Sequence, residues 1–170
     1  PYTTLFRSVG QGTAVLVRTR HHTLLFDTGA RYPNGYDAGE AVIVPALRAL
    51  SVSRLDALLV SHADSDHAGG VDSVLRQLPV LRLMVGETLP LSPVTEAANS
   101  EFCREHQRWH WDGVAFEVLH PPPRYPARGN EISCVLSVRA ANGAGLLLTG
   151  DAGEVAELRM LALHRSRLAS

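Results

Sequence analysis

Short apolar runs separated by polar turns dominate the chain. β-Branched and leucine-rich runs of about four to eight residues, bounded by Gly, Pro, Asn or Asp, are typical of strands. Runs of this kind predict strands at residues 14–18, 23–26, 55–61, 80–85, 109–111, 114–119, 132–138 and 145–149. Polar turns at residues 20–22 and 141–144 join neighbouring runs, so we expect an antiparallel hairpin at each of them.

Longer segments repeat apolar residues at helical spacing. This pattern predicts helices at residues 39–50, 71–78, 94–108 and 152–164. Pro45 must lie in the first turns of its helix or kink it. Glu101 and Arg104 are spaced for a surface ion pair worth ~0.3 kcal/mol, and the spacing of Leu158, Leu161 and Ala162 supports the last helix. Two sheets packed together with helices outside would bury this set of elements.

Composition and charge narrow the class of protein. With 170 residues and 45% hydrophobic content, the chain fits one globular domain with a sizeable core. No run of apolar residues is long enough to span a membrane. The formal net charge of −1 gives no basic patch or field that would hold nucleic acid, so such contacts must be local or mediated by a metal. Because the chain has no lysine, a P-loop lysine and a Schiff-base lysine are excluded.

The two cysteines, Cys103 and Cys134, lie far apart in the sequence. They form no Cys-x-x-Cys pair, which argues against a structural zinc site or a thioredoxin-type motif. We expect each to pack as a small apolar side chain, and they do not define a redox compartment.

A dense group of potential metal ligands follows the predicted strand at residues 55–61. His62, Asp64, Asp66 and His67 fall within six positions, and the next residues are Ala-Gly-Gly, which add no bulk. Imidazoles and carboxylates at this density, directly after a buried strand, predict a metal-binding loop. The alternative, a solvated polar turn that happens to carry two histidines, requires a concentration of ligands that turns rarely show.

Other candidate residues allow two interpretations each. Asp27 ends a predicted strand two residues before Gly29, where an aspartate either caps a turn or serves a site, and Asp151 ends another predicted strand directly after Gly150. The aromatic–His–aromatic segment at residues 109–111 resembles a base-stacking platform, but ordinary packing is the favoured interpretation. Arg124 and Arg128 lie in a polar loop and could contact phosphate, although exposed arginines are common.

Residues 61–70 resemble the signature loop of the metallo-β-lactamase fold, with residues 27–29 and 149–151 at places that this family uses. Residues 9–12, 130–133 and 147–151 are further similar to the carboxy-terminal hydrolase domain of ComEC-type DNA-uptake channels. The resemblance implies an α/β fold of αββα type, a four-layer sandwich of two mixed sheets flanked by helices. It covers residues 9–170, where we expect a domain that is incomplete at its C-terminal end.

The first eight residues do not fit this domain. Residues 1–8 resemble the translation of a common sequencing adapter, so we expect them to be non-native and leave them out of the expected fold.

The resemblance also implies a metal site with one departure from the general family loop. Asp64 stands where that loop has a third histidine, which favours manganese or magnesium while leaving zinc possible. Two divalent ions about 3.5 to 4 Å apart would be held by His62 with Asp64 and by Asp66 with His67. Asp151 would bridge them, and water activated in such a site would be the nucleophile.

The remaining site residues have supporting roles in this interpretation. Catalysis is expected to depend on Asp66, and Asp27 is expected to support the ligands without binding metal. Asn130 and Ser133 match the polar segment near the family's cleft, where they either hydrogen-bond the substrate or satisfy the backbone of their own loop.

The expected function is that of a metal-dependent phosphodiesterase or nuclease, which degrades one DNA strand during competence-related uptake. By resemblance its partners are single-stranded DNA and the membrane channel part of the same bacterial polypeptide, with this domain on the outer face of the cytoplasmic membrane. Two alternatives remain open: another hydrolase of this fold, acting on a thioester, lactone or β-lactam, and a metal-degenerate domain that only positions DNA or a partner. Because a downstream ligand segment is expected to be missing, we predict weak or no activity for residues 1–170.

Overall fold

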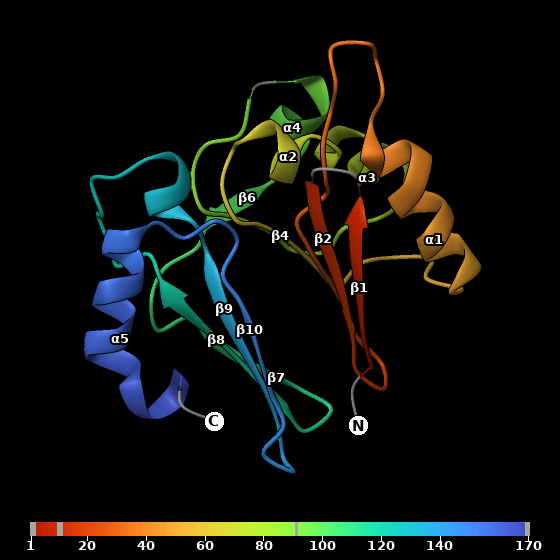
Figure 1. The fold of residues 1–170 in the computed structure, drawn as a ribbon. Helices are drawn as coiled ribbons and strands as arrows, with labels where there is room; N and C mark the ends of the chain where they lie inside the picture. Colours follow the sequence, from red (N-terminus) through yellow and green to blue (C-terminus); the bar gives the residue numbers. More distant parts are fainter. Residues whose placement is uncertain (1–2, 10–11, 91, 169–170) are drawn as a thin grey trace.

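Two β-sheets packed face to face form the centre of the molecule (Figure 1). The computed structural model describes residues 3–9, 12–90 and 92–168. The first sheet has the strand order β1-β2-β3-β4-β5-β6, formed by β1 (Thr3–Val9), β2 (Gly12–Arg18), β3 (Thr23–Phe26), β4 (Ala57–Val60), β5 (Leu83–Val85) and β6 (Ser100–Phe102). The second has the order β10-β9-β8-β7, formed by β7 (Arg108–Trp111), β8 (Val114–His120), β9 (Val135–Ala140) and β10 (Gly145–Leu148).

The first sheet is mixed, as expected. Strands β1, β2 and β3 are antiparallel neighbours, whereas β3, β4, β5 and β6 run parallel to one another. The second sheet is antiparallel in every described pairing, so the expectation of two mixed sheets is wrong for this one. Its strands follow one another through turns and one loop, without the crossover helix that a parallel pair requires.

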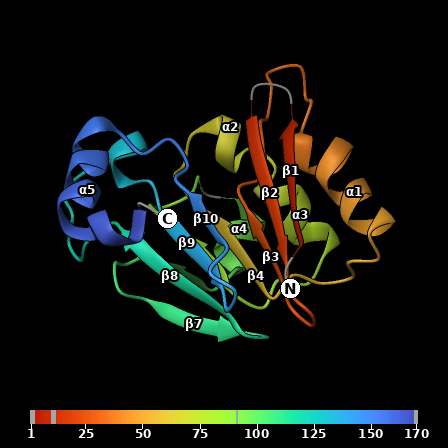
Figure 2. The ribbon, with the colours of Figure 1, turned by 60° about the horizontal axis from the view of Figure 1, so that its bottom comes forward.

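Helices cover the outer face of each sheet (Figure 2). A short π-helix at Gly39–Ile43 continues into α1 (Val44–Ala49), which with α3 (Val71–Gln77) packs on the first sheet. Pro45 lies in the first turn of α1, as expected. Helix α5 (Glu154–Leu168) lies on the second sheet, where Leu119 and Val135 pack against Met160. With the core between the sheets, this gives the expected αββα sandwich.

The segment at residues 94–108 is not the single helix that its spacing suggested. A capping box at Ser92 starts only the short helix α4 (Pro93–Ala97), and β6 follows it. Strand β6 pairs in parallel with β5. Pairing with the open edge of the sheet is therefore favoured here over the helix that the apolar spacing predicts. Glu101 therefore pairs with Arg82 beside the neighbouring strand, and the expected ion pair with Arg104 does not form.

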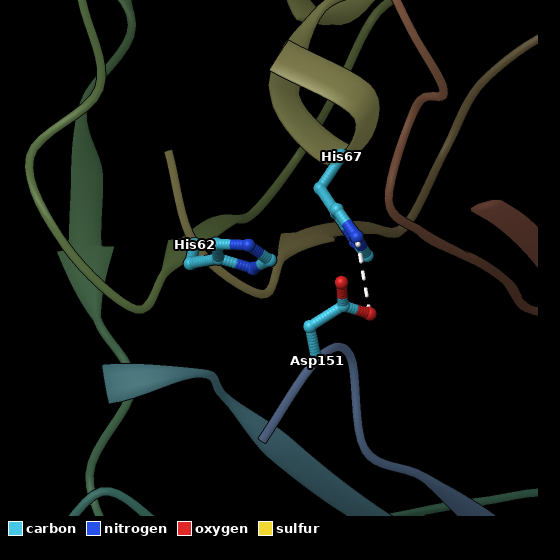
Figure 3. A group of neighbouring side chains, drawn as sticks. All are labelled: His62, His67 and Asp151. Atoms are coloured by element: carbon cyan, nitrogen blue, oxygen red, sulfur yellow. Dashed lines mark ion pairs between the residues drawn. The ribbon is translucent and has the colours of Figure 1, made fainter. Parts of the chain in front are cut away.

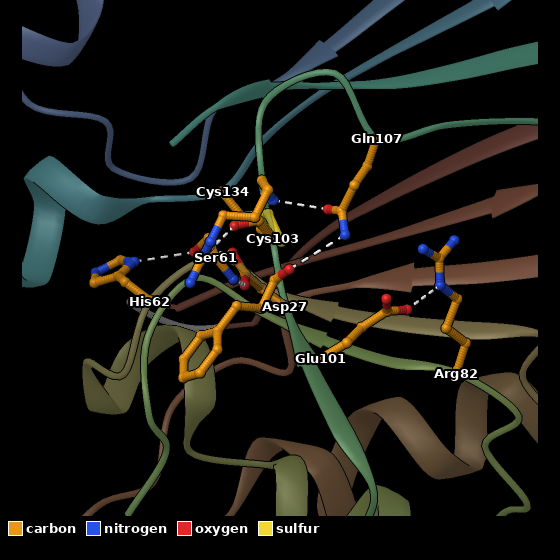
Figure 4. The surroundings of a disulfide bond; sticks show 10 residues. Asp27, Ser61, His62, Arg82, Glu101, Cys103, Gln107 and Cys134 are labelled. Carbon is orange, nitrogen blue, oxygen red and sulfur yellow. Dashed lines mark hydrogen bonds and ion pairs between the residues drawn. A yellow bond between two sulfur atoms is a disulfide. The ribbon is translucent and has the colours of Figure 1, made fainter. Parts of the chain in front are cut away.

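Cys103 and Cys134 form a disulfide, so the expectation that they pack as separate apolar side chains is wrong (Figure 4). Their Cα atoms are 6.0 Å apart, although 31 positions separate them in the sequence. Cys103 follows β6 of the first sheet and Cys134 precedes β9 of the second, so the bond ties the two sheets together. The backbone N–H of Cys134 also donates to the carbonyl of Ser61, 2.9 Å away.

Two further side-chain patterns are settled by the packing. Trp109 stacks on Phe116 with ring centroids 5.1 Å apart, and Trp111 packs edge-on to the same ring, which confirms packing as the role of residues 109–111. In the part of α5 whose burial is described, residues 154–163, Ala156 and Met160 are buried, whereas Leu158 and Leu161 face solvent.

Residues 1–8 include a regular element. Thr3–Val9 forms the edge strand β1 and pairs with β2 from Thr3 opposite Arg18 to Val9 opposite Gly12. The proposed adapter origin of residues 1–8 stays a prediction, and Pro1 and Tyr2 lie outside the described residues.

Candidate metal centre

The candidate site lies where two parallel strands of the first sheet end. Strand β3 ends at Phe26 and is followed by Asp27, while β4 ends at Val60 and is followed by Ser61 and His62. Because β3 and β4 are parallel neighbours, their carboxyl ends meet at one edge of the sheet. The next residues form a short helix, α2 (Ser65–Ala68), which carries Asp66 and His67 back over that edge.

His62, His67 and Asp151 meet at this edge, as Figure 3 shows. One ligand atom from each lies within 4.8 Å of the others. The two imidazole rings have centroids 4.3 Å apart, and His67 Nε2 lies 3.3 Å from Asp151 Oδ1. Asp151 arrives from the second sheet, just after β10, so the two halves of the sandwich close the site from opposite sides.

Asp64 and Asp66 complete the group of expected ligands. Asp64 Oδ2 lies 3.4 Å from His62 Nε2, and Asp66 Oδ2 lies 3.8 Å from His67 Nε2. Their side chains are 58% and 43% exposed, and that of Asp151 is 48% exposed, so the carboxylates stand at the open side of the site. The fold thus places Asp64 beside His62 and Asp66 beside His67, while the residues whose ligand atoms all lie close to one another are His62, His67 and Asp151.

Asp27 holds His67 from behind. It is fully buried, and its backbone has a φ of 60°, in the left-handed region that costs a residue with a side chain about 1 kcal/mol or more. Its carboxylate accepts hydrogen bonds from the N–H of Ser61 at 2.7 Å, from Ser61 Oγ at 2.9 Å and from His67 Nδ1 at 2.7 Å. This confines Nδ1 of His67 to the interior and leaves Nε2 facing Asp151 and Asp66.

The charges around His67 decide its protonation. Burial alone would lower the pKa of His67, but the hydrogen bond and charge of Asp27, with the charges of Asp151 and Asp66, raise it to about 9. Burial raises the pKa of Asp27, and its hydrogen bonds with His67 and Ser61 oppose that shift. Without a metal, the Nε2 proton of His67 therefore occupies the position that a cation would take.

His62 is held in the same way by two hydroxyl groups. Its Nδ1 lies 3.0 Å from Ser61 Oγ and 3.3 Å from Ser133 Oγ. Ser133 is fully buried, so it orients His62 and does not reach the cleft, where substrate binding had been one of its two expected roles. Asn130 is exposed, and its carbonyl accepts the N–H groups of Ser133 and Gly153.

The residues present fit a divalent cation. His62 Nε2 is buried and has no hydrogen-bond partner among the described residues, which is costly for a polar atom unless something binds it. It points to the same place as His67 Nε2 and the Asp151 carboxylate. Two imidazole nitrogens facing three half-exposed carboxylates form a donor set that suits divalent metals.

Close backbone contacts explain the glycines at the site. A Cβ on Gly150 would lie 2.6 Å from Ser61 Cβ, and Gly150 has a φ of 54°, so glycine lets the turn before Asp151 press against Ser61. A Cβ on Gly69 would collide with the backbone of Arg31 and Ser65. The glycine after α2 is therefore needed for backbone packing behind the loop, rather than for space beside the ligands.

Two residues that the sequence did not single out organise the site. Ser61 contacts Asp27, His62 and His67, but a serine before a histidine carries no distinctive signal in one sequence. Glu87 Oε1 accepts the N–H of Ala63 at 3.1 Å and that of Gly129 at 3.2 Å, which ties the metal loop to the loop before Asn130. Its position directly after β5, near other strand ends, was the available signal.

Two packed sheets with outer helices, and a histidine–carboxylate cluster where the strands of both sheets end, define the metallo-β-lactamase fold. The chain belongs to the metallo-β-lactamase superfamily, whose family model matches residues 7–169. Members of this superfamily are mostly hydrolases and typically bind divalent metals such as zinc.

Known proteins similar to the chain include bacterial competence proteins. Competence protein ComA of Neisseria gonorrhoeae is 43% identical over 161 residues, which cover 95% of this chain and 21% of ComA. Recombination protein 2 of Haemophilus influenzae is 35% identical over 144 residues, which cover 85% of this chain and 17% of that protein. The chain thus spans about a fifth of the length of these curated relatives.

Solved structures support the fold alone. The subclass B3 metallo-β-lactamase MEM-A1, from a soil metagenome library, superimposes with a TM-score of 0.60 at 20% identity, covering 85% of this chain and 58% of that one. Within the described ranges, no helix has the length and apolar character needed to cross a membrane.

Proposed function

We propose that this domain is a metal-dependent phosphodiesterase that cleaves single-stranded DNA during competence-related DNA uptake. The observation that carries the proposal is the buried Nε2 of His62, which makes no hydrogen bond among the described residues and is grouped with His67 and Asp151, with the Asp64 carboxylate 3.4 Å away. The similarity to a competence protein and a recombination protein supports DNA as the substrate.

The donor set supports manganese or magnesium, with zinc as the third candidate. Three carboxylates against two imidazoles make the site richer in hard oxygen donors than a site built on histidines. We assign His62 and Asp64 to one ion, Asp66 and His67 to the other, and Asp151 to both. When bound, the ions would polarise a phosphoryl oxygen and activate water for attack on phosphorus.

The residues of the chain prepare this chemistry. Asp27 fixes the ring of His67 through Nδ1, and Ser61 and Ser133 fix that of His62, so neither ring must reorient when a ligand arrives. Asp66 is half exposed at the open side, and we assign its carboxylate to accept a proton from the attacking water and return one to the leaving oxygen. No serine or cysteine nucleophile is required.

The disulfide supports the proposed location on the outer face of the cytoplasmic membrane. Disulfides form and persist in oxidising compartments and are rare inside most bacterial cells. Cys103 and Cys134 form one here. A membrane channel in the same polypeptide would then be the partner of the domain, as the greater length of ComA and of recombination protein 2 allows.

Cleavage of a defined oligonucleotide tests the proposal. We expect the full-length protein to cut a fluorescent single-stranded DNA when manganese is added and to leave it intact in a chelator. Asp66→Ala should abolish cleavage with folding retained, whereas Glu157→Gln, on an exposed position of α5, should leave it unchanged. Hydrolysis of a thioester or lactone without DNA cleavage would identify the enzyme alternative, and metal-independent DNA binding without turnover the non-catalytic one.

A further inference from the structure

A second pocket with an excess of positive charge lies beside the metal loop. It has a volume of about 370 Å³, and its side chains include Arg104, Arg124, Arg128, Phe102, Tyr125 and Glu87. We call it the arginine pocket. Three guanidinium groups face one carboxylate here, although the chain as a whole has a net charge of −1.

The positive charge of this pocket is not balanced from within the protein. The one carboxylate, on Glu87, already accepts the N–H groups of Ala63 and Gly129. Arg124 and Arg128 are exposed, and neither has an ion-pair partner in the part of the chain that the structure describes. Arg124 moreover has a φ of 60°, a conformation that a residue with a side chain adopts at a cost. An unpaired arginine cluster in a concave site favours an anionic ligand.

The pocket adjoins the metal centre directly. Gly86 and Ile132 form part of its wall, and a Cβ on Gly86 would collide with the carbonyl oxygen of Ser61, next to His62. Ile132 precedes Ser133, whose hydroxyl group holds His62. Glu87 also binds the N–H of Ala63, the residue after His62. The wall of the arginine pocket therefore contacts the residues on either side of His62.

We propose that the arginine pocket binds the phosphate backbone of single-stranded DNA next to the phosphodiester that is cleaved. This inference rests on the proposed function and adds the feature that holds the strand. Arg124 and Arg128 each contact a phosphate group through their guanidinium groups, while Arg104 forms the wall of the pocket. Arg104 is held in place by the carbonyl of Cys103 at 2.6 Å and by the ring of Phe102, whose centroid lies 4.8 Å away.

Two aromatic rings in the pocket fit the same ligand. Phe102 is 44% exposed on the edge strand β6. Tyr125 is held edge-on by His120, with ring centroids 5.0 Å apart. Aromatic side chains next to arginines are the combination that binds single-stranded nucleic acid, because bases stack while phosphates pair with charge. The rings of Trp109 and Trp111 pack on Phe116 and do not line this pocket.

A larger pocket on the other side of the metal loop does not compete for the phosphate. Its volume is about 540 Å³, and it is lined by Ala63, Ser65 and Gly69 of the loop together with Tyr32 and Leu89. Its two charged residues are Arg31 and Asp72, so their charges cancel. This lining suits a sugar or a base better than a phosphate group.

Binding of DNA without metal tests the arginine pocket apart from catalysis. In a chelator, we expect Arg124→Ala/Arg128→Ala to weaken binding of a fluorescent oligothymidylate by about tenfold. The slope of log K against log salt should also fall by about 1.4, since each lost phosphate contact on a single strand contributes about 0.7. The matched control is Arg20→Ala, which removes an exposed arginine in the turn between β2 and β3, at the far end of the strands.

Substitution by lysine separates charge from structure. Arg124→Lys/Arg128→Lys keeps both charges, so it should retain the salt slope of the unchanged protein. Absence of oligothymidylate binding by the unchanged protein, or equal losses in the double alanine variant and Arg20→Ala, would overturn the inference.

Cleavage kinetics distinguish failure of this inference from failure of the proposed function. In the full-length protein with manganese, the double alanine variant should raise the KM for the oligonucleotide about tenfold. It should leave hydrolysis of bis(p-nitrophenyl) phosphate unchanged, because that diester has no neighbouring phosphate. Oligonucleotide cleavage with an unaltered KM in the variant refutes the arginine pocket but keeps the nuclease. Binding that depends on the two arginines, with no cleavage of either diester, keeps the pocket and refutes the nuclease.

Discussion

The two walls of the metal centre are built in opposite ways. The histidine wall, Asp27, Ser61, His62 and His67, is at most 2% exposed and joined by short hydrogen bonds. The carboxylate wall, Asp64, Asp66 and Asp151, keeps about half of its side-chain surface in solvent. Hydrogen bonds fix the side chains of the histidine wall, whereas the half-exposed side chains of the carboxylate wall are positioned mainly by the backbone that carries them.

This difference has an electrostatic reason. Burying three carboxylates together without a cation would cost several kcal/mol for each charge, so they stay hydrated until a cation is present. The imidazoles can be buried because Asp27, Ser61 and Ser133 satisfy their Nδ1 atoms. The fold thus fixes the direction of the nitrogen ligands in advance and leaves the oxygen ligands free to adjust.

The largest effect is expected from removing the anchor of the histidine wall. Asp27→Ala leaves His67 and Ser61 without their buried acceptor, so the free energy of unfolding should fall by about 4 kcal/mol. Urea denaturation without metal measures it. The matched control is Asp64→Ala in the carboxylate wall, where Asp64 makes no side-chain cap hydrogen bond, and the expected change is below about 0.5 kcal/mol. If Asp27→Ala and Asp64→Ala lowered the free energy of unfolding equally, the two walls would contribute equally to stability, which contradicts the comparison.

Removal of the disulfide should cause the next largest loss of stability. The disulfide supports the histidine wall, because the backbone N–H of Cys134 donates a hydrogen bond to the carbonyl of Ser61. Opening a loop of 31 positions by Cys103→Ser/Cys134→Ser should lower the free energy of unfolding by about 3 kcal/mol. Denaturation of the unchanged protein with and without dithiothreitol gives the same comparison. A reduced protein as stable as the oxidised one would contradict this role.

The metal loop, residues 62–67, was the part of the site most accessible from sequence. A buried apolar run followed by closely spaced histidines and aspartates reports a strand and its loop directly, since all of these residues are local in the chain. Asp27 and Asp151 were found as strand-terminal acids near a glycine. Their contacts with His67 depend on how β3, β4 and β10 assemble, which only the resemblance to the family indicated.

What the sequence could not reveal depends on contacts between distant segments. The disulfide joins strands of different sheets, and no local pattern near Cys103 or Cys134 reports that proximity. The open edge of β5 turns residues 100–102 into a strand, although the surrounding spacing is helical. Ser133 is polar in a polar segment, and its role becomes visible only when His62 lies 3.3 Å away.

The pH dependence of metal binding probes the contact between the two walls. The pKa of His67 is about 9 against an ordinary 6.5, so metal must displace its Nε2 proton. Affinity for manganese should rise about tenfold per pH unit between about pH 7 and 9 and level off above. In the metal-free protein the protonated ring contributes its full stability below about pH 6.5 and loses it as the pH rises through about 9. Titration calorimetry at several pH values measures the manganese affinity, and urea denaturation measures the stability of the metal-free protein. If the affinity does not rise with pH, or if the stability does not fall, the raised pKa of His67 is contradicted.

The smallest effect on folding, combined with a clear effect on metal binding, is expected for Asp151→Asn. The side chain is 48% exposed, so the free energy of unfolding should change by less than about 0.5 kcal/mol. The loss of one anionic ligand beside His67 should nevertheless weaken manganese binding by at least about tenfold. Calorimetric titration measures this affinity, with Glu157→Gln on α5 as the control for loss of a negative charge elsewhere. If Asp151→Asn lowers the free energy of unfolding as much as Asp27→Ala does, the side chain of Asp151 contributes to the stability of the fold. The claim that the carboxylate wall is free to adjust would then be wrong.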